Sequence, residues 1–293
     1  YSFSDDLSLL SGRHMLKGGL IARRIHANNA SETNFYGTMS FRSVNDFLAG
    51  RALSYTINTG DPRLDLRANE AGFYFQDDWR AARALMLNLG LRYERFAVPS
   101  ERHGRLPALY RADGNNFAPR IGFAWDLGGA AKSVVRGGYG VYYNPLLLNM
   151  IGDTRFAPPL VFSYTLANPT LPPDLSRASL GLNRTVLDPG IRNPFVQNWN
   201  LTVERALARS TVVSAAYVGT KADSLARARL PNGGANLAQT SRPDPSTGMI
   251  TRYESSASSN YHSLQLTARG AWSNGLIFRS AYTFGKSIDN ASA

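Results

Sequence analysis

The sequence predicts an all-β protein, an antiparallel transmembrane β-barrel, and three observations support this prediction. Many segments alternate between apolar and polar residues, as strands do when successive side chains point to opposite faces. Short and long connections between these segments also alternate along the chain. Aromatic residues gather near the segment ends, which is typical of strands that cross the two interfaces of a bilayer.

Composition excludes several other classes. The chain has 293 residues, of which 43% are hydrophobic, and no run approaches the roughly 18 apolar residues of a spanning helix. A barrel remains compatible with this composition, because only alternate residues of each strand need to be apolar. The chain has no cysteine, which agrees with an outer-membrane or periplasmic protein but is a weak signal.

The chain is strongly basic, with a formal net charge of +11. The Lys and Arg residues are scattered over strands and turns, without a helix-turn-helix pattern or zinc-finger spacing. We therefore expect solvated and lumen-facing arginines and no nucleic-acid partner. Anionic lipid headgroups are a further class of partner for such a charge.

The first third of the chain gives short segments and then two clear strands. We expect strands at 1–10, 14–27, 34–42 and 51–59, a helical turn at 43–50 that ends at Gly50, and a polar loop at 60–69. Residues 72–80 place Phe73, Phe75 and Trp79 on one face. The strictest alternation runs from Leu85 to Tyr93, where a helix would scatter the leucines around its surface.

A polar loop at 98–115 leads into the segment that shows the hairpin pattern most fully, residues 116–145. Gly128 and Gly129 supply the positive φ angles that a tight turn needs. The glycines at 137, 138 and 140 suit a tilted, curved sheet that another group approaches closely. The alternating residues of its first arm are Ile121, Phe123, Trp125 and Leu127 against Arg120, Gly122, Ala124 and Asp126.

The last part of the chain holds two further strand pairs and two long connections. Residues 145–195 contain eight prolines, and we expect a long irregular connection there. Strands are expected at 196–207, 211–220, 260–272 and 276–287, with a second polar loop at 221–259. Asn274-Gly275 is a strong signal for a short hairpin turn between the last two strands.

The connections follow a regular order. The short ones lie at 11–13, 43–50, 81–83, 128–132, 208–210 and 273–275, and the longer ones at 28–33, 60–69, 98–115, 145–195 and 221–259. Outer-membrane barrels have short periplasmic turns and long outer loops, whereas a β-sandwich has no reason to keep this alternation.

Eight aromatic residues are expected to form two girdles at the interfaces of the bilayer. They are Trp79, Trp125, Trp199 and Trp272 on the apolar faces of their strands, and Tyr93, Tyr142, Tyr143 and Tyr261 near the ends of long loops. The alternative is a soluble core that places aromatic residues at strand ends.

Several motifs occur in an order that is similar to a known family. The segments 72–80, 87–94, 116–125 and 135–143 resemble the barrel of TonB-dependent outer-membrane receptors. The segments 193–201, 215–221, 261–265 and 280–290 resemble the Oar-like subgroup, whose members carry a carboxypeptidase-regulatory-like domain.

The resemblance implies a 22-stranded barrel, of which residues 1–293 would supply about twelve strands as a fragment. The plug domain and the C-terminal strands would then be absent from it. A twelve-stranded barrel that closes on itself is the alternative. An isolated half would leave two open edges, which a bilayer does not tolerate.

The resemblance also implies a function, the TonB-coupled uptake of a bulky substrate such as an oligosaccharide, a peptide or a siderophore-like compound. The implied partners are outer-membrane lipid, the plug domain of the full-length chain and a TonB-type inner-membrane energy transducer. Two alternatives remain. One is an outer-membrane adhesin or surface-scaffold barrel, and the other is a secreted, soluble, carbohydrate-binding β-sandwich.

No pattern of catalytic residues supports an enzyme, and we expect no cofactor and no metal site. The residues His14, His26, His103 and His262 lack metal-ligand spacing. Asp77 and Asp78 are neighbours on a strand, so they point to opposite faces and form no carboxylate pair.

The polar face is expected to line the lumen, contacting a plug and bordering the path of a substrate. Generic hydration with charges paired across strands is the alternative for each residue. The candidates are Asn88, Arg92, Glu94, Arg120, Asp126, Arg136, Asn198, Asn200, Glu204, Gln265 and Arg269. The loops at 145–195 and 221–259 are the best candidates for ligand capture, because exposed loops carry recognition.

Overall fold

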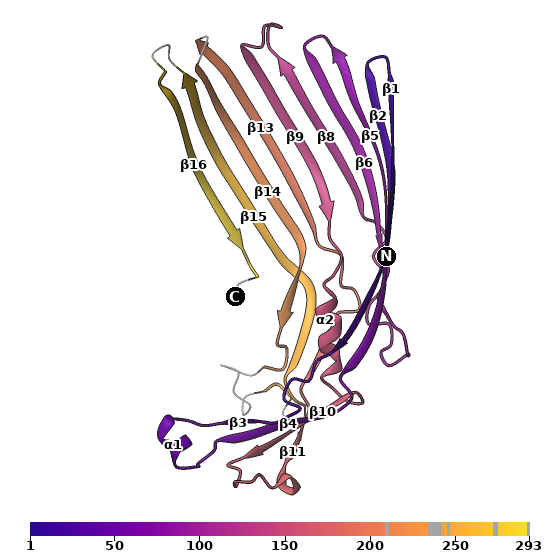
Figure 1. Cartoon of the computed structure of the whole chain (residues 1–293), viewed down its shortest axis with the longest axis vertical. Helices are drawn as coiled ribbons and strands as arrows, with labels where there is room; N and C mark the ends of the chain where they lie inside the picture. Colours follow the sequence, from indigo (N-terminus) through magenta and orange to yellow (C-terminus); the bar gives the residue numbers. More distant parts are fainter. Residues whose placement is uncertain (209–210, 234–241, 245–246, 272–274, 292–293) are drawn as a thin grey trace.

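Most of the chain forms one curved β-sheet (Figure 1). The computed structural model describes residues 1–208, 211–233, 242–244, 247–271 and 275–291. The long strands of the sheet are β1 (Ser2–Ser11), β2 (His14–Ala30), β5 (Arg63–Ala82), β6 (Leu85–Phe96), β8 (Phe117–Asp126), β9 (Ser133–Tyr143), β13 (Phe195–Ala208), β14 (Thr211–Arg229), β15 (Ile250–Ala271) and β16 (Ile277–Asp289). Two short strands, β7 (Ser100–Glu101) and β12 (Arg184–Leu187), complete the twelve strands that this sheet has within the described residues.

The ten long strands follow one another in sequence order and pair antiparallel. Their short turns lie together at the top of Figure 1, and their long connections lie at the lower end. Gly12, Gly128 and Gly129 have positive φ in these turns, as the sequence predicts for the two glycines of the central hairpin. The predicted alternation of short turns and long loops is confirmed for the connections between the ten long strands. The turn at 208–210 and the turn at 273–275 lie largely outside the described residues.

Two predicted barrel strands belong to a different sheet. The segments 34–42 and 51–59 contain only β3 (Thr38–Ser40) and β4 (Ser54–Gly60), which pair with each other. With β10 (Val161–Ala167) and β11 (Ser179–Gly181) they form a four-stranded sheet in the order β11-β10-β4-β3. Local alternation predicts a strand but not its partner, so the assignment of these segments to the barrel is wrong.

The helical turn predicted at 43–50 is present as α1 (Val44–Leu48). The Ser43 hydroxyl caps it by accepting the backbone N–H of Asp46 at 3.1 Å, and Gly50 follows it with φ +66°. Because α1 lies between β3 and β4, the connection at 43–50 is part of a long loop and not a short turn of the barrel.

The polar loop predicted at 60–69 is wrong. β5 already begins at Arg63, and its alternate residues Leu64 and Leu66 are 1% and 4% exposed. The charged residues between them hide this period of two in the sequence. β5, paired with β2 down to Arg63, therefore continues beyond its pairing with β6 and carries apolar side chains into the looped end of the molecule.

The connections at 145–195 and 221–259 are more ordered than the sequence predicts. The first contains α2 (Leu148–Gly152), η1 (Asp153–Arg155), β10, η2 (Leu175–Arg177), β11 and β12. The second is shorter than expected, because β14 runs to Arg229 and β15 begins at Ile250. The expectation of an irregular connection is therefore wrong for 145–195, and the polar loop predicted at 221–259 is too long at both ends.

The looped end has a hydrophobic core of its own. The cluster consists of Leu64, Leu66, Ile151, Leu160, Val161 and Leu187. Beside it Arg155, which is 5% exposed, donates hydrogen bonds to the carbonyl oxygens of Gly152, Asn29 and Pro62 at 2.7–3.1 Å. These bonds tie α2 to the ends of the loop between β2 and β5, so the loops form a packed unit.

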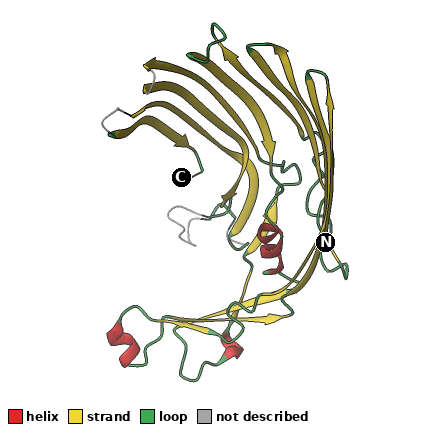
Figure 2. Ribbon diagram, turned by 45° about the horizontal axis from the view of Figure 1, so that its top comes forward, coloured by secondary structure: helices red, strands yellow, loops and turns green. Residues whose placement is uncertain are grey.

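The rest of the sheet is a single layer. Figure 2 shows the long strands as a curved wall, with helices only at the looped end. Within the described ranges, no helix is both long enough and apolar enough to cross a membrane. The soluble β-sandwich considered above requires a second sheet packed on the first, and the four-stranded sheet is instead confined to the looped end.

Candidate functional site

One face of the sheet consists largely of exposed apolar side chains. Phe73, Phe75 and Ile121 each expose more than half of their surface. The same face carries Phe3, Leu7, Leu9, Leu20, Leu89, Leu91, Phe117, Trp125, Leu201, Val203, Leu264, Leu266, Tyr282 and Phe284, all exposed. Soluble proteins rarely leave so large an apolar surface uncovered. We call this surface the apolar face.

The opposite surface is the polar face, and the strand register places all eleven predicted lumen residues on it. Asn88, Gly122, Gly138 and Asn200 are successive cross-strand partners from β6 to β13. The eleven residues are Asn88, Arg92, Glu94, Arg120, Asp126, Arg136, Asn198, Asn200, Glu204, Gln265 and Arg269. The sequence pattern predicts this common face, but not which residues on it meet.

Charges on the polar face are mostly paired with neighbours. The Lys17 ammonium lies 2.8 Å from Asp78 Oδ2, while Gln76 and Asn88 donate to Asp78 Oδ1 at 2.8 and 2.7 Å. Arg92 Nε lies 2.9 Å from Glu94 Oε1. Two further predicted residues, Glu204 and Arg269, approach to 3.9 Å.

Asp77 points to the other side, as predicted, and forms a 2.7 Å contact with His14 Nδ1 on the apolar face. The two adjacent aspartates therefore serve separate networks on opposite faces of the sheet.

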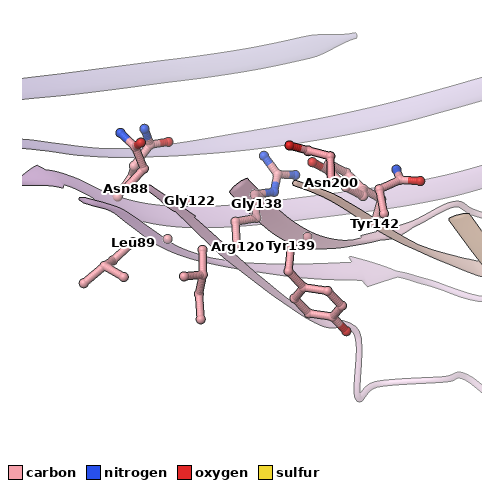
Figure 3. Close-up of a pocket in the computed structure, with 13 residues that line it drawn as sticks. Asn88, Leu89, Arg120, Gly122, Gly138, Tyr139, Tyr142 and Asn200 are labelled. Atoms are coloured by element: carbon pink, nitrogen blue, oxygen red, sulfur yellow. The ribbon is translucent and has the colours of Figure 1, made fainter. Parts of the chain in front are cut away.

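Four glycines form the floor of a shallow hollow on the polar face, which we call the glycine cradle (Figure 3). Its volume is about 230 Å³, and Gly90, Gly122, Gly138 and Gly140 line it without side chains. Figure 3 shows Asn88, Arg120 and Asn200 directed to one side of the sheet and Leu89 and Tyr139 to the other. The cradle is therefore polar on its open side, with Arg120 rising from its floor.

Arg120 is a cation without a partner of opposite charge among the described residues. Its guanidinium carbon lies 4.6 Å from the centre of the Tyr142 ring, and its buried Nε makes no hydrogen bond within the described chain. A Cβ at Gly140 would lie 2.9 Å from the Tyr142 hydroxyl, so glycine makes room for this ring. The cation–π contact holds the guanidinium in place, while its remaining N–H groups can meet a ligand.

The two ends of the cradle offer different hydrogen-bonding groups. One N–H of the Gln76 amide and one of the Asn88 amide donate to Asp78, which leaves their carbonyl oxygens as acceptors and their second N–H as a donor. On β13 the Asn198 oxygen accepts from the Thr220 hydroxyl at 2.9 Å, which leaves the Asn198 amide as a donor. Together with Arg120, this arrangement suits a polar group that both accepts and donates hydrogen bonds, such as a peptide unit or a sugar.

Sequence reasoning missed Lys17, Gln76, Asp78 and Tyr142 as members of this site. Each contributes through a partner on another strand, and cross-strand partners are visible only when the register is known. The glycines at 138 and 140 are the sequence signal for this site, because they leave space in which another group can approach the backbone closely.

The aromatic residues divide between the faces. The register places Trp79, Trp125, Trp199, Tyr93 and Tyr143 on the apolar face, as the girdle requires. Tyr142 and Tyr261 lie on the polar face, so their assignment to a lipid-facing girdle is wrong. The strict alternation of a strand already forbids Tyr142 and Tyr143 from sharing a face. Trp272 lies outside the described residues.

The two predicted capture loops meet at the looped end. Asn183, from the first loop, accepts the backbone N–H of Met249 at 2.7 Å, and β12 pairs with the start of β15. A hollow of about 540 Å³ lies between them, with Arg177 and Arg242 in its lining. In this region the backbone N–H of Gly190 and then the Arg252 guanidinium hold the pKa of Asp188 below its ordinary value.

The four histidines do not converge on a metal site. Within the part of the chain that the structure describes, no group of three or more potential metal-ligating side chains comes together.

Comparison with known proteins agrees with this architecture. A family model described as outer membrane beta barrel domain matches residues 1–293. No curated protein matches the sequence. The structure is similar to the outer membrane transporter YddB from Escherichia coli, with 16% identity, a TM-score of 0.63, and coverage of 99% of this chain and 33% of that one.

Two further solved structures are similar. The FrpB iron transporter from Neisseria meningitidis (F5-1 variant) has 12% identity, a TM-score of 0.57, and coverage of 100% and 36%. The ferripyoverdine receptor of Pseudomonas aeruginosa has 14% identity, a TM-score of 0.53, and coverage of 99% and 32%. The chain therefore spans about a third of the length of these proteins.

Proposed function

The chain belongs to the outer membrane beta-barrel domain family, and we propose that it forms part of the wall of a transporter, with its polar face toward the pore. Its location is the outer membrane. One observation supports the orientation most strongly, namely that exposed apolar side chains gather on one face of a single layer while the pairs Lys17–Asp78 and Arg92–Glu94 lie on the other. In a bilayer the apolar face contacts lipid and the polar face contacts water.

The transport that we propose is the TonB-coupled uptake of a bulky substrate, with this chain as part of an Oar-like receptor. A plug domain would close the pore and a TonB-type inner-membrane protein would open it. The glycine cradle would then hold a polar group of the plug or of the substrate as it passes. Oligosaccharides, peptides and siderophore-like compounds all carry groups that fit its acceptors and donors.

An adhesin or surface-scaffold barrel is the second candidate function, because the looped end is a packed unit with its own core. Such a protein would bind its partner through the loops and would transport nothing. We expect no enzymatic activity in either case.

Substrate uptake that depends on the proton-motive force distinguishes a transporter from an adhesin or scaffold. Cells with the intact gene and cells that lack it are given labelled oligosaccharides, peptides and ferric siderophores, and the label inside washed cells is measured. We expect gene-dependent accumulation of at least one class, which an uncoupler of the proton-motive force abolishes. Binding to the cell surface that persists with the uncoupler, without accumulation of any class, would contradict transport and favour the adhesin.

A further inference from the structure

A row of polar aromatic and basic side chains crosses the apolar face. Tyr139, Trp199, Gly219, His262 and Lys286 are successive Cα partners from β9 to β16. All five positions lie on the face that otherwise carries the exposed apolar residues. We call these five positions the boundary row, because of their position relative to the edge of the apolar band.

The height follows from the distance to the short turns. Trp199 and His262 each lie about nine residues from the turn end of their strand. Nine residues of a strand tilted by about 40° span roughly 23 Å along the membrane normal, which is close to the height of the apolar band of such barrels. Trp79 and Trp125 lie within about three residues of their turns. Trp199, His262 and Lys286 therefore mark the outer edge of the band, and the two tryptophans mark the inner edge.

His262 is held by its neighbours on the apolar face. Its Nδ1 lies 2.7 Å from the Tyr217 hydroxyl, and its ring lies 5.9 Å from the Trp199 ring, centre to centre. A Cβ at Gly219 would lie 2.3 Å from the Trp199 ring, so this glycine lets the indole lie flat across β14 toward His262. With Nδ1 engaged by the hydroxyl, Nε2 is the nitrogen that remains for a ligand.

Two lysines flank His262 on the neighbouring strands. Lys286 on β16 is its direct cross-strand partner, and Lys221 on β14 is the partner of Asn260, two residues before it on the same face. Lys221 also contacts Asp223 at 3.3 Å. Toward the turns the same strands expose Leu264, Leu266, Tyr282 and Phe284. Basic groups thus lie next to an apolar surface on the side away from the turns. This arrangement complements a lipid, which carries an anionic headgroup on apolar acyl chains.

We propose that Lys286, His262 and Lys221 bind the phosphate of an anionic lipid in the outer leaflet, with its acyl chains against Leu264, Leu266 and Phe284. The site is independent of the proposed transport, since it lies on the face opposite the glycine cradle. Each lysine near an anionic bilayer surface contributes about 1 kcal/mol, so the pair accounts for roughly thirtyfold in lipid retention.

Lipid retention tests the site. The protein, purified from outer membranes in mild detergent, is analysed for bound lipid by phosphorus assay and mass spectrometry. We expect the double variant Lys221→Gln/Lys286→Gln to retain roughly a thirtieth of the phosphorylated lipid of the unchanged protein. The variant Lys221→Arg/Lys286→Arg keeps both charges and should retain the lipid. Equal retention in the glutamine variant and the unchanged protein would overturn the proposal.

Arg205 provides the matched control, because it is a cation on the same face near the opposite edge of the band. Arg205→Gln should retain the phosphorylated lipid, and an equal loss there would show a general charge effect and overturn the site. The source of the phosphate is tested with excess inorganic phosphate, which should leave the lipid bound. Release of the lipid by inorganic phosphate would assign the site to the free ion and contradict the lipid. Circular dichroism of all variants shows that the sheet is retained.

Discussion

Leu89→Arg is expected to destabilise the protein in a bilayer by about 2–4 kcal/mol, because it places a charge in the apolar band. Leu89 lies near the middle of the band on β6 and exposes 39% of its surface on the apolar face. An arginine there must lose its hydration or distort the surrounding lipid. Urea unfolding in lipid vesicles, followed by tryptophan fluorescence, measures the change in the free energy of unfolding.

Asn88→Arg is the matched control, since it adds the same side chain one residue earlier on the polar face. Asn88 lies 2.7 Å from a carboxylate oxygen of Asp78, so the new cation has an anionic neighbour and access to water. We expect a change of less than about 1 kcal/mol. Equal losses from the two substitutions would contradict the assignment of the faces.

Asp78→Asn is expected to lower the free energy of unfolding by about 1–3 kcal/mol. The Asp78 carboxylate accepts from Lys17, Gln76 and Asn88, and asparagine cannot serve these three donors equally. Lys17 is left without its counter-charge, although about a third of its side chain remains in solvent, which moderates the cost.

The double variant Lys17→Met/Asp78→Asn separates pairing from general damage. Removing the lysine as well removes the unpaired cation, so the double variant should lose less stability than the sum of the two single variants. The coupling free energy from this double-mutant cycle should be about 1 kcal/mol in favour of the pair. Additive losses would show that the Lys17–Asp78 contact contributes no stability of its own.

The sequence predicts the membrane-spanning part of the fold well, for a physical reason. The sheet there is a single layer with a different environment on each face. Apolar and polar residues therefore alternate along each strand, as from Leu85 to Tyr93. All eleven polar-face residues follow from that alternation. Their pairing does not, because Asp78 and Lys17 are 61 residues apart in sequence and meet only through the register.

The looped end could be predicted much less well. Its segments bury side chains against each other, so strands such as β3 and β10 are short and carry charged or proline-rich neighbours. β5 shows the difficulty, because Leu64 and Leu66 are buried by residues such as Ile151 and Leu187, far away in the sequence. Tertiary packing decides such segments, and local pattern does not record it.

Thiol accessibility tests the central claim, that the apolar face meets lipid and the polar face meets water, most directly. Arg92 and Leu91 are neighbours on β6 with opposite facing, so a cysteine is placed at each in turn. In intact membranes, a charged, membrane-impermeant thiol reagent should label Arg92→Cys rapidly and leave Leu91→Cys unlabelled until detergent is added. Rapid labelling of Leu91→Cys with protection of Arg92→Cys would contradict the orientation of the sheet and the transport role built on it.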